Sequence, residues 1–582
     1  MSKTSLYAQP KHKTSFVLNQ WDLFILLIVF GVFAALVWGA QQMVTPYQLG
    51  ESIQVSLSPS MLPQYAIRTV IRMAIALSFS LLFTFTIGTL AAKSRRAEMF
   101  IIPFIDIMQS VPILGFLSIS ILGFIYLFPS SQLGPECAAI FVIFTSQVWN
   151  MALSFYQSLK TIPKELNEAS SMFHLSAWQR FWRLEVPFAT PSLIWNTMMS
   201  LSAGWFFVVA SEAISVNNQK IMLPGIGSYI MLASKESNYA AICYVILTMF
   251  LVILIYDQLI FRPLISWSEK FKLEPNLDME SNSTWFLNIL QRAHITHQFV
   301  RLMNRCRDLI TIPKFKRNIT STERIPVKVK QALSWTAITF WNCLLLLSLL
   351  ACAFFLIRFI YTELSLTEVL EVFELGFITT IKVFILIVLC SLIWVPIGVW
   401  IGLNPRIAQA VQPLVQFLAS FPANLVYPVL FMLIVTYKLN VNIWTAPLMI
   451  LGTQWYILFN VVAGTMQLPL ELRLAAKNYG VKGWLWWRKV ILPGIFPYYV
   501  TGAMTAAGGC WNASIVADVV EWQQTTLHAT GIGAYITEFT TVGDFPRIAL
   551  GISVMCIYVI VINRLVWRKL YELSEERYGH ST

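Results

Sequence analysis

The chain has 582 residues, of which 57% are hydrophobic and only 12% are charged, and its formal net charge is +12. This composition excludes an ordinary soluble enzyme and indicates a polytopic membrane protein. The positive charge does not indicate nucleic-acid binding, because the cations cluster in loops between apolar runs, as the positive-inside rule expects. The eight cysteines are scattered without a Cys-x-x-Cys pair, so neither a disulfide framework nor a zinc site is expected.

The first half of the chain contains roughly six apolar runs, each about 20 residues or longer and therefore able to cross the membrane. The cationic N-terminus precedes the first run without a small-residue cleavage site, so we expect an uncleaved first span. The predicted spans of this half are 22–41, 67–92, 100–128, 136–157, 189–213 and 240–262.

A basic segment, 263–332, links the halves and carries twelve Lys and Arg against six Asp and Glu. Apolar residues recur in it at helical spacing, which predicts an amphipathic helix on an anionic membrane surface or, alternatively, on a partner. The apolar positions are Phe286, Ile289, Leu290, Ala293, Phe299, Val300 and Met303, and the arginines are Arg292, Arg301, Arg305 and Arg307. His294 and His297 lack a third ligand at suitable spacing, so we expect no metal there.

The second half repeats the first. Its predicted spans are 335–358, 378–402, 411–436, 444–466, 495–518 and 547–567. At an offset of 310, Arg72 corresponds to Lys382, and Ser110-x-Pro112 to Ser420-x-Pro422. At an offset of 306, Trp205 corresponds to Trp511, Glu212 to Asp518, and GIGSYI (225–230) to GIGAYI (531–536).

We therefore expect an all-α polytopic membrane protein with two tandem six-helix domains, 1–262 and 333–582, and about twelve transmembrane helices. The halves should be related by a pseudo-two-fold axis along the membrane normal. Basic residues flank the even-numbered spans, which predicts cytoplasmic N- and C-termini. Whether the GIGSYI and GIGAYI segments are re-entrant helices or external loops stays open.

Two polar loops, 163–187 and 469–493, are the most informative copies of the repeat. Both begin with Pro-x-Glu-Leu and end with proline, and each predicts a short helix, a break and a second helix. The orientation above places both on the cytoplasmic side.

Transport against a gradient needs a source of energy, and the chain contains no Gly-Lys-Ser/Thr that would form a phosphate-binding P-loop. Buried ionisable residues in mid-span would indicate an ion-driven transporter. The predicted spans are almost free of them, which favours an ATPase on another chain.

The two loops resemble the EAA coupling motif of binding-protein-dependent ATP-binding cassette (ABC) importer permeases. The first contains Glu168-Ala169-Ser170, with His174 where the motif has glycine. The second contains Leu474-Ala475-Ala476 and Gly480. The endings LIFRPLISWSE and LVWRKLYELSE are similar to those of the nitrate, sulfonate, taurine and bicarbonate branch.

This resemblance implies that the loops couple the membrane domain to two cytoplasmic ABC ATPase subunits. The small residues would let helices approach closely, the tryptophans would anchor the contact, and the glutamates would favour a helix start. The coupling residues it implies are Glu165, Glu168, Ala169, Ser170, Trp178, Glu471, Ala475, Ala476, Gly480 and Trp484. ATP and Mg would bind the ATPases, and no cofactor or metal is expected on this chain.

Candidate residues of the solute pathway come from repeated polar or aromatic positions. The prolines would break spans and free backbone amides, although an ordinary kink or a packing role is the alternative. The candidates are Ser110, Pro112, Ser420, Pro422, Trp205, Trp511, Arg72 and Lys382. Arg72 and Lys382 would attract an anion or snorkel to headgroups. Glu212 and Asp518 would contact an external binding protein or cap a helix.

We accordingly expect the duplicated permease of a bacterial inner-membrane ABC importer. A periplasmic or lipid-anchored binding protein would deliver an oxyanion, a sulfonate or a similar small solute. The alternatives are a permease for a non-anionic solute, a gradient-driven secondary transporter, and a membrane scaffold or sensor.

Overall fold

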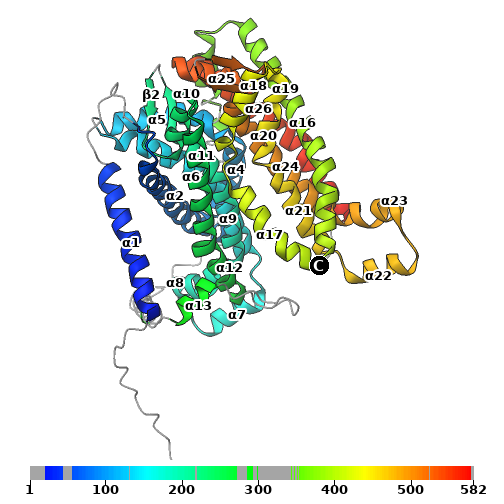
Figure 1. Ribbon diagram of the computed structural model, residues 1–582. Coiled ribbons are helices and arrows are strands. Elements are labelled where there is room, and N and C mark those ends of the chain that lie inside the picture. Colours follow the sequence, from blue (N-terminus) through cyan, green and yellow to red (C-terminus); the bar gives the residue numbers. More distant parts are fainter. Residues whose placement is uncertain are drawn as a thin grey trace, which may run out of the picture.

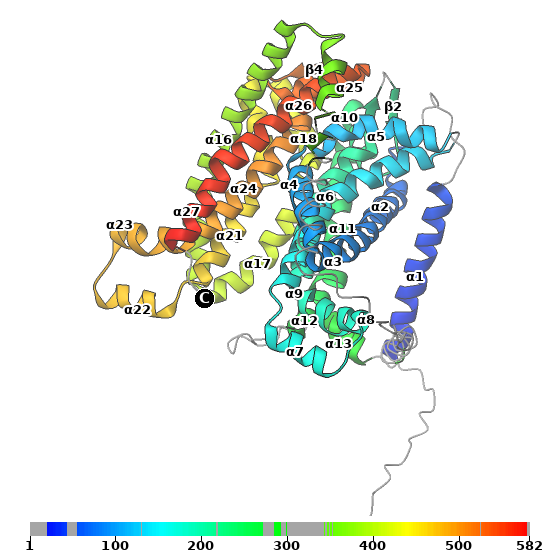
Figure 2. The same ribbon diagram turned by 180° about the vertical axis from the view of Figure 1, so that it is seen from behind.

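The computed structural model describes residues 20–43, 55–129, 131–216, 219–271, 285–292, 353–523 and 525–578, with a few single positions between 298 and 351. Within these ranges the protein is helical apart from two small β-hairpins (Figures 1 and 2). In the same residues, seven helices are long and apolar enough to cross a membrane, or eight if the bent pair Val441–Leu451 and Gln454–Met466 counts as one span. The all-α membrane fold expected from the sequence is confirmed.

The first half is built around α6 (Leu133–Lys160) and α9 (Val186–Glu212), which make the most extensive contact among the described helices. Both α2 (Leu62–Phe83) and α5 (Ile113–Leu127) pack against α6. The remaining helices of this half are α1 (Gln20–Met43), α3 (Thr89–Lys93), α4 (Arg95–Ser110), α7 (Lys164–Met172), α8 (Ala177–Arg180), α10 (Ile226–Lys235), α11 (Tyr239–Tyr256) and α12 (Arg262–Ser268).

The second half reproduces this arrangement. Its counterpart of α9 is α24 (Leu492–Ala517), and α24 packs on α21 (Gln454–Met466), which in turn packs on α16 (Leu366–Leu403). The remaining helices are α17 (Pro405–Ser420), α18 (Tyr427–Thr436), α19 (Val441–Trp444), α20 (Ala446–Leu451), α22 (Leu470–Asn478), α23 (Gly483–Trp486), α25 (Ile532–Val542), α26 (Phe545–Ile562) and α27 (Arg568–Tyr578).

One predicted span of each half is broken in two. Helix α4 ends at Ser110 and α17 ends at Ser420, and an extended residue followed by proline comes next in both. Pro112 precedes α5, and Pro422 precedes a single turn, Ala423–Leu425, that leads into α18. Proline lacks an N–H and restricts the residue before it, so both breaks follow from the sequence.

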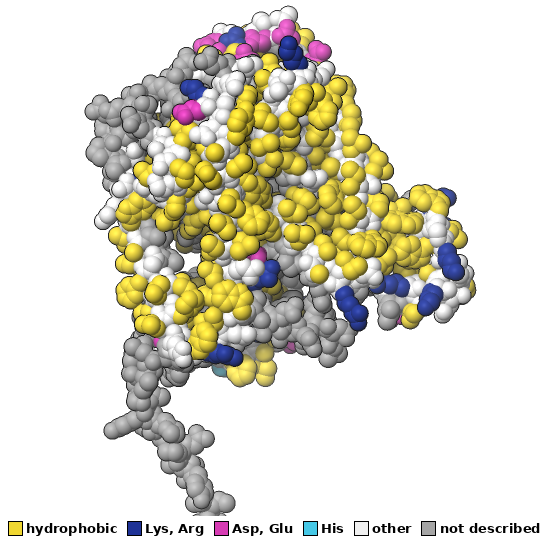
Figure 3. Space-filling view, viewed as in Figure 1, with side chains coloured by type: hydrophobic (Ala, Val, Ile, Leu, Met, Phe, Trp, Pro, Cys, Tyr) yellow, Lys and Arg dark blue, Asp and Glu magenta, His cyan; other side chains and the backbone are white. Residues whose placement is uncertain are grey.

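The two ends of the bundle differ, and we call them the hairpin side and the loop side. On the hairpin side, β1 (Ala213–Val216) pairs antiparallel with β2 (Gln219–Met222), and β3 (Val519–Trp522) with β4 (Thr525–His528). On the loop side lie the 163–187 loop with α7 and α8 and the 469–493 loop with α22 and α23 (Figures 1 and 2). Figure 3 shows a broad hydrophobic surface between them, with Asp and Glu gathered at the hairpin side.

Only a small part of the 263–332 linker lies among the described residues. Its helix α13 (Trp285–Arg292) contains the predicted apolar positions Phe286, Ile289 and Leu290. Phe286 is buried, and α13 packs against α1 and α12 on the loop side. The predicted positions beyond Arg292, including His294 and His297, and most of the predicted 335–358 span lie outside the described residues.

Candidate functional site

A cavity of about 790 Å³ lies between the two halves. Side chains of α6 and α9 form one wall, and side chains of α21 and α24 form the other. Its polar lining consists of hydroxyl groups and of the amides Gln109, Asn150, Gln157, Asn196, Asn460, Asn512 and Asn563. No Asp, Glu, Lys or Arg is found among the described residues that line it. The cavity therefore offers a neutral, hydrogen-bonding path rather than an ion-pairing site.

Contacts between the halves close the cavity toward the hairpin side. The side-chain amide of Asn424 donates to the Phe206 carbonyl at 3.0 Å, and the Ser202 and Ser420 hydroxyls lie 2.9 Å apart. Nearer the hairpins, the Tyr239 and Trp522 rings are 6.0 Å apart. In the opposite direction the lining reaches Gln157 near the end of α6 and Tyr571 in α27, so the cavity extends to the loop side.

The two broken spans contribute to these contacts, each against the other half. The backbone N–H of Ile113, directly after Pro112, donates to Asn512 Oδ1 at 2.7 Å. Asn424, close behind Pro422, reaches Phe206, the residue that corresponds to Asn512 in the repeat. The first break thus presents a backbone N–H to the other half, and the second presents a side-chain amide.

The predicted pathway residues divide by their distance from this cavity. Trp511 lines it, while Trp205 is buried and packs edge-on against Tyr256 at 5.7 Å within its own half. Pro112 and Pro422 are buried at the breaks. Ser420 bonds across the halves, and of Ser110 the structure describes only the backbone. Arg72 and Lys382 are not among the described lining residues.

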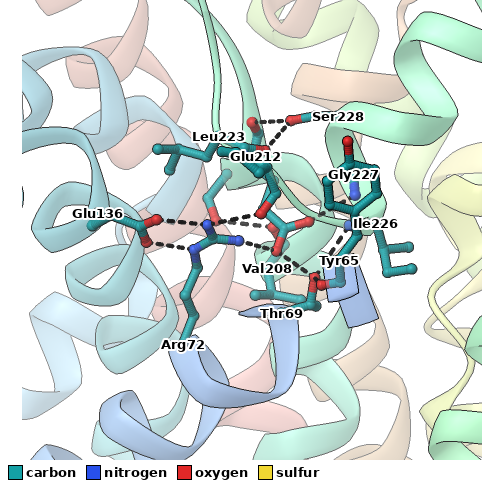
Figure 4. A network of polar contacts seen from close by, with 12 residues as sticks. Tyr65, Thr69, Arg72, Glu136, Val208, Glu212, Leu223, Ile226, Gly227 and Ser228 are labelled. Carbon is teal, nitrogen blue, oxygen red and sulfur yellow. Dashed lines mark hydrogen bonds and ion pairs between the residues drawn. The ribbon is translucent and has the colours of Figure 1, made fainter. Parts of the chain in front are cut away.

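Arg72 instead forms the centre of a buried ion network near the hairpin side (Figure 4). Its guanidinium donates twice to Glu136, at 2.5 and 2.7 Å, and once to Glu212, at 2.6 Å. The three side chains are at most 1% exposed. The expectation that Arg72 snorkels to headgroups is wrong, because two carboxylates from α6 and α9 converge on it inside the protein.

Glu212 connects this network to the start of α10. Its second carboxylate oxygen accepts the N–H of Gly227 at 2.7 Å, and Thr69 donates to the first at 2.6 Å. Of the two roles expected for Glu212, the structure supports the helix cap, because a fully buried carboxylate is inaccessible to a binding protein. Glu136 was not predicted, because neither offset of the repeat pairs it with another acidic residue: the positions are Asn442 and Ala446.

The corresponding cluster of the second half is smaller. Lys382 makes one contact with Asp518, at 3.2 Å, and Thr379 accepts the N–H of Ile532 at 3.1 Å. Asp518 Oδ2 has no hydrogen-bond partner although it is buried. The ion pair thus occurs at the same position in both copies, but most hydrogen bonds of the first cluster have no counterpart in the second.

On the loop side, α7 and α22 have matching geometry. Each begins directly after proline and is followed by a residue with a left-handed backbone, His174 with φ 50° and Gly480 with φ 65°. The N–H of the next residue returns to the corresponding helix carbonyl in both, Leu175 to Ser170 at 3.2 Å and Val481 to Ala476 at 2.9 Å. These are Schellman-type helix ends, so one loop geometry is built from two different sequences.

The predicted coupling residues are on these helices and on the short helices that follow. Ser170 and Ala476 are buried, and Ala169 and Ala475 are partly buried. The predicted acidic residues and both tryptophans are exposed, with Trp178 at 47% and Trp484 at 73%. The exposed members of the predicted set are Glu165, Glu168, Glu471, Gly480, Trp178 and Trp484.

The first loop is fastened to its membrane domain by ion pairs. The buried carboxylate of Glu185 lies 2.8 Å from Lys93 Nζ and 3.2 Å from Arg180 Nε, and Arg180 also donates to Asn167 at 2.8 Å. In the second loop Ile491 takes the place of Glu185. Among the described residues of that loop, Arg473 supplies the side-chain bond to the membrane domain, donating to the Thr465 carbonyl at 2.5 Å.

A further ion pair joins α4 and α6 on the loop side. Lys160 donates to Glu98 at 2.7 Å, and Tyr156 donates to the other carboxylate oxygen at 2.5 Å. The hydrogen bond from Lys160 holds the pKa of the partly exposed Glu98 carboxyl below its usual value. Glu98 is therefore ionised at neutral pH and fixes the start of the broken span.

A duplicated helical membrane domain with a neutral cavity between its halves is the architecture of a transport permease. Residues 84–262 and 394–572 each match the family of binding-protein-dependent transport system inner membrane components. Since the two matches cover more than half of the chain, the protein belongs to this family and contains its domain twice.

Individual relatives are distant. The chain is 21% identical over 194 residues to the bicarbonate transport system permease protein of Synechococcus elongatus, a match covering 33% of this chain and 65% of that protein. It is 23% identical over 189 residues to the nitrate import permease protein of Synechocystis, covering 32% and 64%. It is 24% identical over 221 residues to the trimethylamine N-oxide transport system permease protein of Pelagibacter ubique, covering 38% and 28%. The matches thus span less than two thirds of these relatives.

Proposed function

We propose that the protein is the membrane permease of an ABC importer and that ATP hydrolysis on two separate ATPase subunits drives it. The observation that carries this proposal is the pair of matching helices, α7 and α22, on the side to which the cavity extends. Each helix would fit a groove on one ATPase subunit and transmit its closure to α9 or α24, which follow the loops directly. ATP and Mg would bind the ATPases, not this chain.

The loop side is, in this proposal, the cytoplasmic side of a bacterial inner membrane. The second loop alone carries Arg473, Lys477, Lys482, Arg488 and Lys489. The positive-inside rule places such loops in the cytoplasm, and with them both ends of the chain. A binding protein would then deliver solute to the hairpin side, and the structure would correspond to the inward-facing state.

The solute is proposed to be small and, by likeness to the bicarbonate and nitrate permeases, an anion. The trimethylamine N-oxide relative and the neutral cavity lining favour a second candidate, a dipolar solute without net charge. Transport of nitrate, bicarbonate and trimethylamine N-oxide by the same reconstituted complex separates the two candidates.

The gradient-driven alternative is disfavoured by the placement of charge. Ion-coupled transporters carry ionisable residues along the solute path, whereas Arg72, Glu136 and Glu212 pair with one another away from the cavity. Permease co-purified with its ATPase subunits and reconstituted in vesicles should accumulate solute only with ATP. Accumulation by the permease alone, driven by an ion gradient, would refute the proposal.

The matched test of coupling is Ala475→Glu. A carboxylate buried unpaired in the ATPase contact costs about 2–5 kcal/mol, so ATP-driven uptake should fall more than tenfold while the protein still folds. Val542→Glu, on an exposed position of the hairpin side, is the control and should leave uptake unchanged. Equal uptake by both variants would contradict a role for α22.

A further inference from the structure

Helix α23 carries an exposed apolar surface that the proposed ATPase contact does not require. Trp484 is 73% exposed and Leu485 is 53% exposed, both on the short helix that leads into α24. In the first loop the matching Trp178 stacks on Phe181 at 6.2 Å, and Gln179 replaces the leucine. The second loop has therefore gained apolar surface where the first has a polar residue.

Three exposed cations surround this apolar surface, namely Lys482, Arg488 and Lys489. In the described part of the chain, none of the ion pairs involves them. An apolar face bearing tryptophan and flanked by uncompensated cations matches the chemistry of a membrane–water interface with anionic headgroups.

The position of α23 places this surface at headgroup level. A π-helical turn, Trp487–Ile491, joins α23 directly to α24, and the whole of Gly483–Ala517 qualifies as one membrane span. In Figures 1 and 2, α23 extends sideways from the bundle beside the loop-side part of α21, with α22 farther toward the loop side. Figure 3 shows hydrophobic side chains on the bundle-facing part of this projection and Lys and Arg along its lower edge.

We propose that α23 is an interfacial anchor that seats Trp484 and Leu485 in the membrane and binds anionic lipid headgroups through Lys482, Arg488 and Lys489. Lipid then holds the second loop in place, as the ion pairs of Glu185 hold the first loop against its membrane domain. The exposed apolar surface of α23 continues toward Leu492, the first residue of α24, which is 38% exposed, and this favours lipid over an ATPase groove. The ATPase contact stays with α22.

A photocrosslinker distinguishes the possible occupants directly. With p-benzoylphenylalanine replacing Leu485, irradiation of the complete transporter in vesicles containing phosphatidylglycerol should give a lipid adduct, detected by mass spectrometry. The same replacement of Gln179, the matching position of the first loop, is the control and should give little lipid adduct. A Leu485 adduct mainly with an ATPase subunit, or with a second copy of this chain, would overturn the proposal.

The preference for anionic headgroups is tested by removing the positive charges near α23. Each cation near an anionic surface strengthens binding about fivefold, so a Lys482→Gln, Arg488→Gln, Lys489→Gln variant should lose at least about tenfold in lipid adduct at Leu485. The wild-type adduct should also fall when phosphatidylcholine alone forms the vesicle. Equal adduct in both vesicles and in the variant would refute anionic recognition. Because this readout needs no ATP, its failure is distinct from failure of the proposed transport.

Discussion

The two halves place an ion cluster at the same point of the fold and build it to different strength. In the first half Arg72 binds two carboxylates through three contacts of 2.5–2.7 Å, all in the interior. In the second half Lys382 is 12% exposed and makes one contact of 3.2 Å with Asp518. The duplicated position thus joins the second and fifth predicted spans of each domain, and it is bonded more extensively in the first half.

Side-chain length explains most of this difference. Glu212 reaches the N–H of Gly227 at the start of α10, whereas Asp518 is one methylene shorter and leaves its Oδ2 without a partner. Arginine also presents a planar fork that can bind two carboxylates, which lysine lacks. The comparison predicts a rigid first half at the hairpin side and a second half that opens there more easily.

The largest expected effect comes from Arg72→Met. It leaves Glu136 and Glu212 as buried carboxylates without a counter-charge, which should cost about 3–5 kcal/mol of stability. Lys382→Met should cost clearly less, because only Asp518 loses a partner and the site is partly exposed. Midpoints of thermal unfolding in detergent measure both.

Equal shifts for these two variants would contradict the comparison. A variant Arg72→Met that fails to fold would be replaced by Arg72→Lys, which keeps the charge but loses the fork. It should still unfold at lower temperature than the wild type, whereas Lys382→Arg should not.

The second effect concerns the loops. Glu185→Leu removes the acid that holds Lys93 and Arg180, so the first loop should loosen by about 1–2 kcal/mol, a value reduced by the partial exposure of both cations. Hydrogen exchange of the α7 amides measures it. Ile491→Val, a small change at the matching buried position, should alter exchange in α22 much less, and equally faster exchange in both loops would contradict the difference between them.

Features that depend on local sequence were predicted well. The breaks at Pro112 and Pro422, the short helices after Pro163 and Pro469, and the repeat itself all follow from hydropathy, proline and self-similarity. These signals need no knowledge of which helices are neighbours.

Features that depend on tertiary neighbours were not predicted. Glu136 meets Arg72 across 64 residues, and nothing local marks it as a partner. The bond between Asn512 and Ile113 joins residues 399 apart and exists only because the halves face each other. The pathway roles of all eight candidates stay predictions, although Trp511 lines the cavity and Arg72 lies in the ion network instead.

A longer side chain at position 518 should strengthen the weaker ion cluster of the second half. Asp518→Glu gives the carboxylate the reach that Glu212 has and should let it accept the N–H of Gly533, as Glu212 accepts that of Gly227. One buried hydrogen bond is worth about 1 kcal/mol, so the unfolding midpoint should rise slightly. The reverse change, Glu212→Asp, should lower it by more, because three donors contact that carboxylate. A loss of stability in Asp518→Glu would show that space rather than reach limits the second cluster.

The smallest expected effect is at the end of α7. His174 has φ 50°, a left-handed backbone that costs a residue with a Cβ about 1–2 kcal/mol. Glycine removes this cost but loses about 0.5–1 kcal/mol more entropy on folding, so His174→Gly should stabilise the loop by only about 0.5 kcal/mol. Gly480→His should have the opposite sign, and nothing within 4 Å of a Cβ at Gly480 would obscure it. Hydrogen exchange of α7 and α22 measures both changes. If His174→Gly instead loosened α7, the imidazole would be making a stabilising contact. The two loops would then differ in side-chain contacts at a position where both have a left-handed backbone.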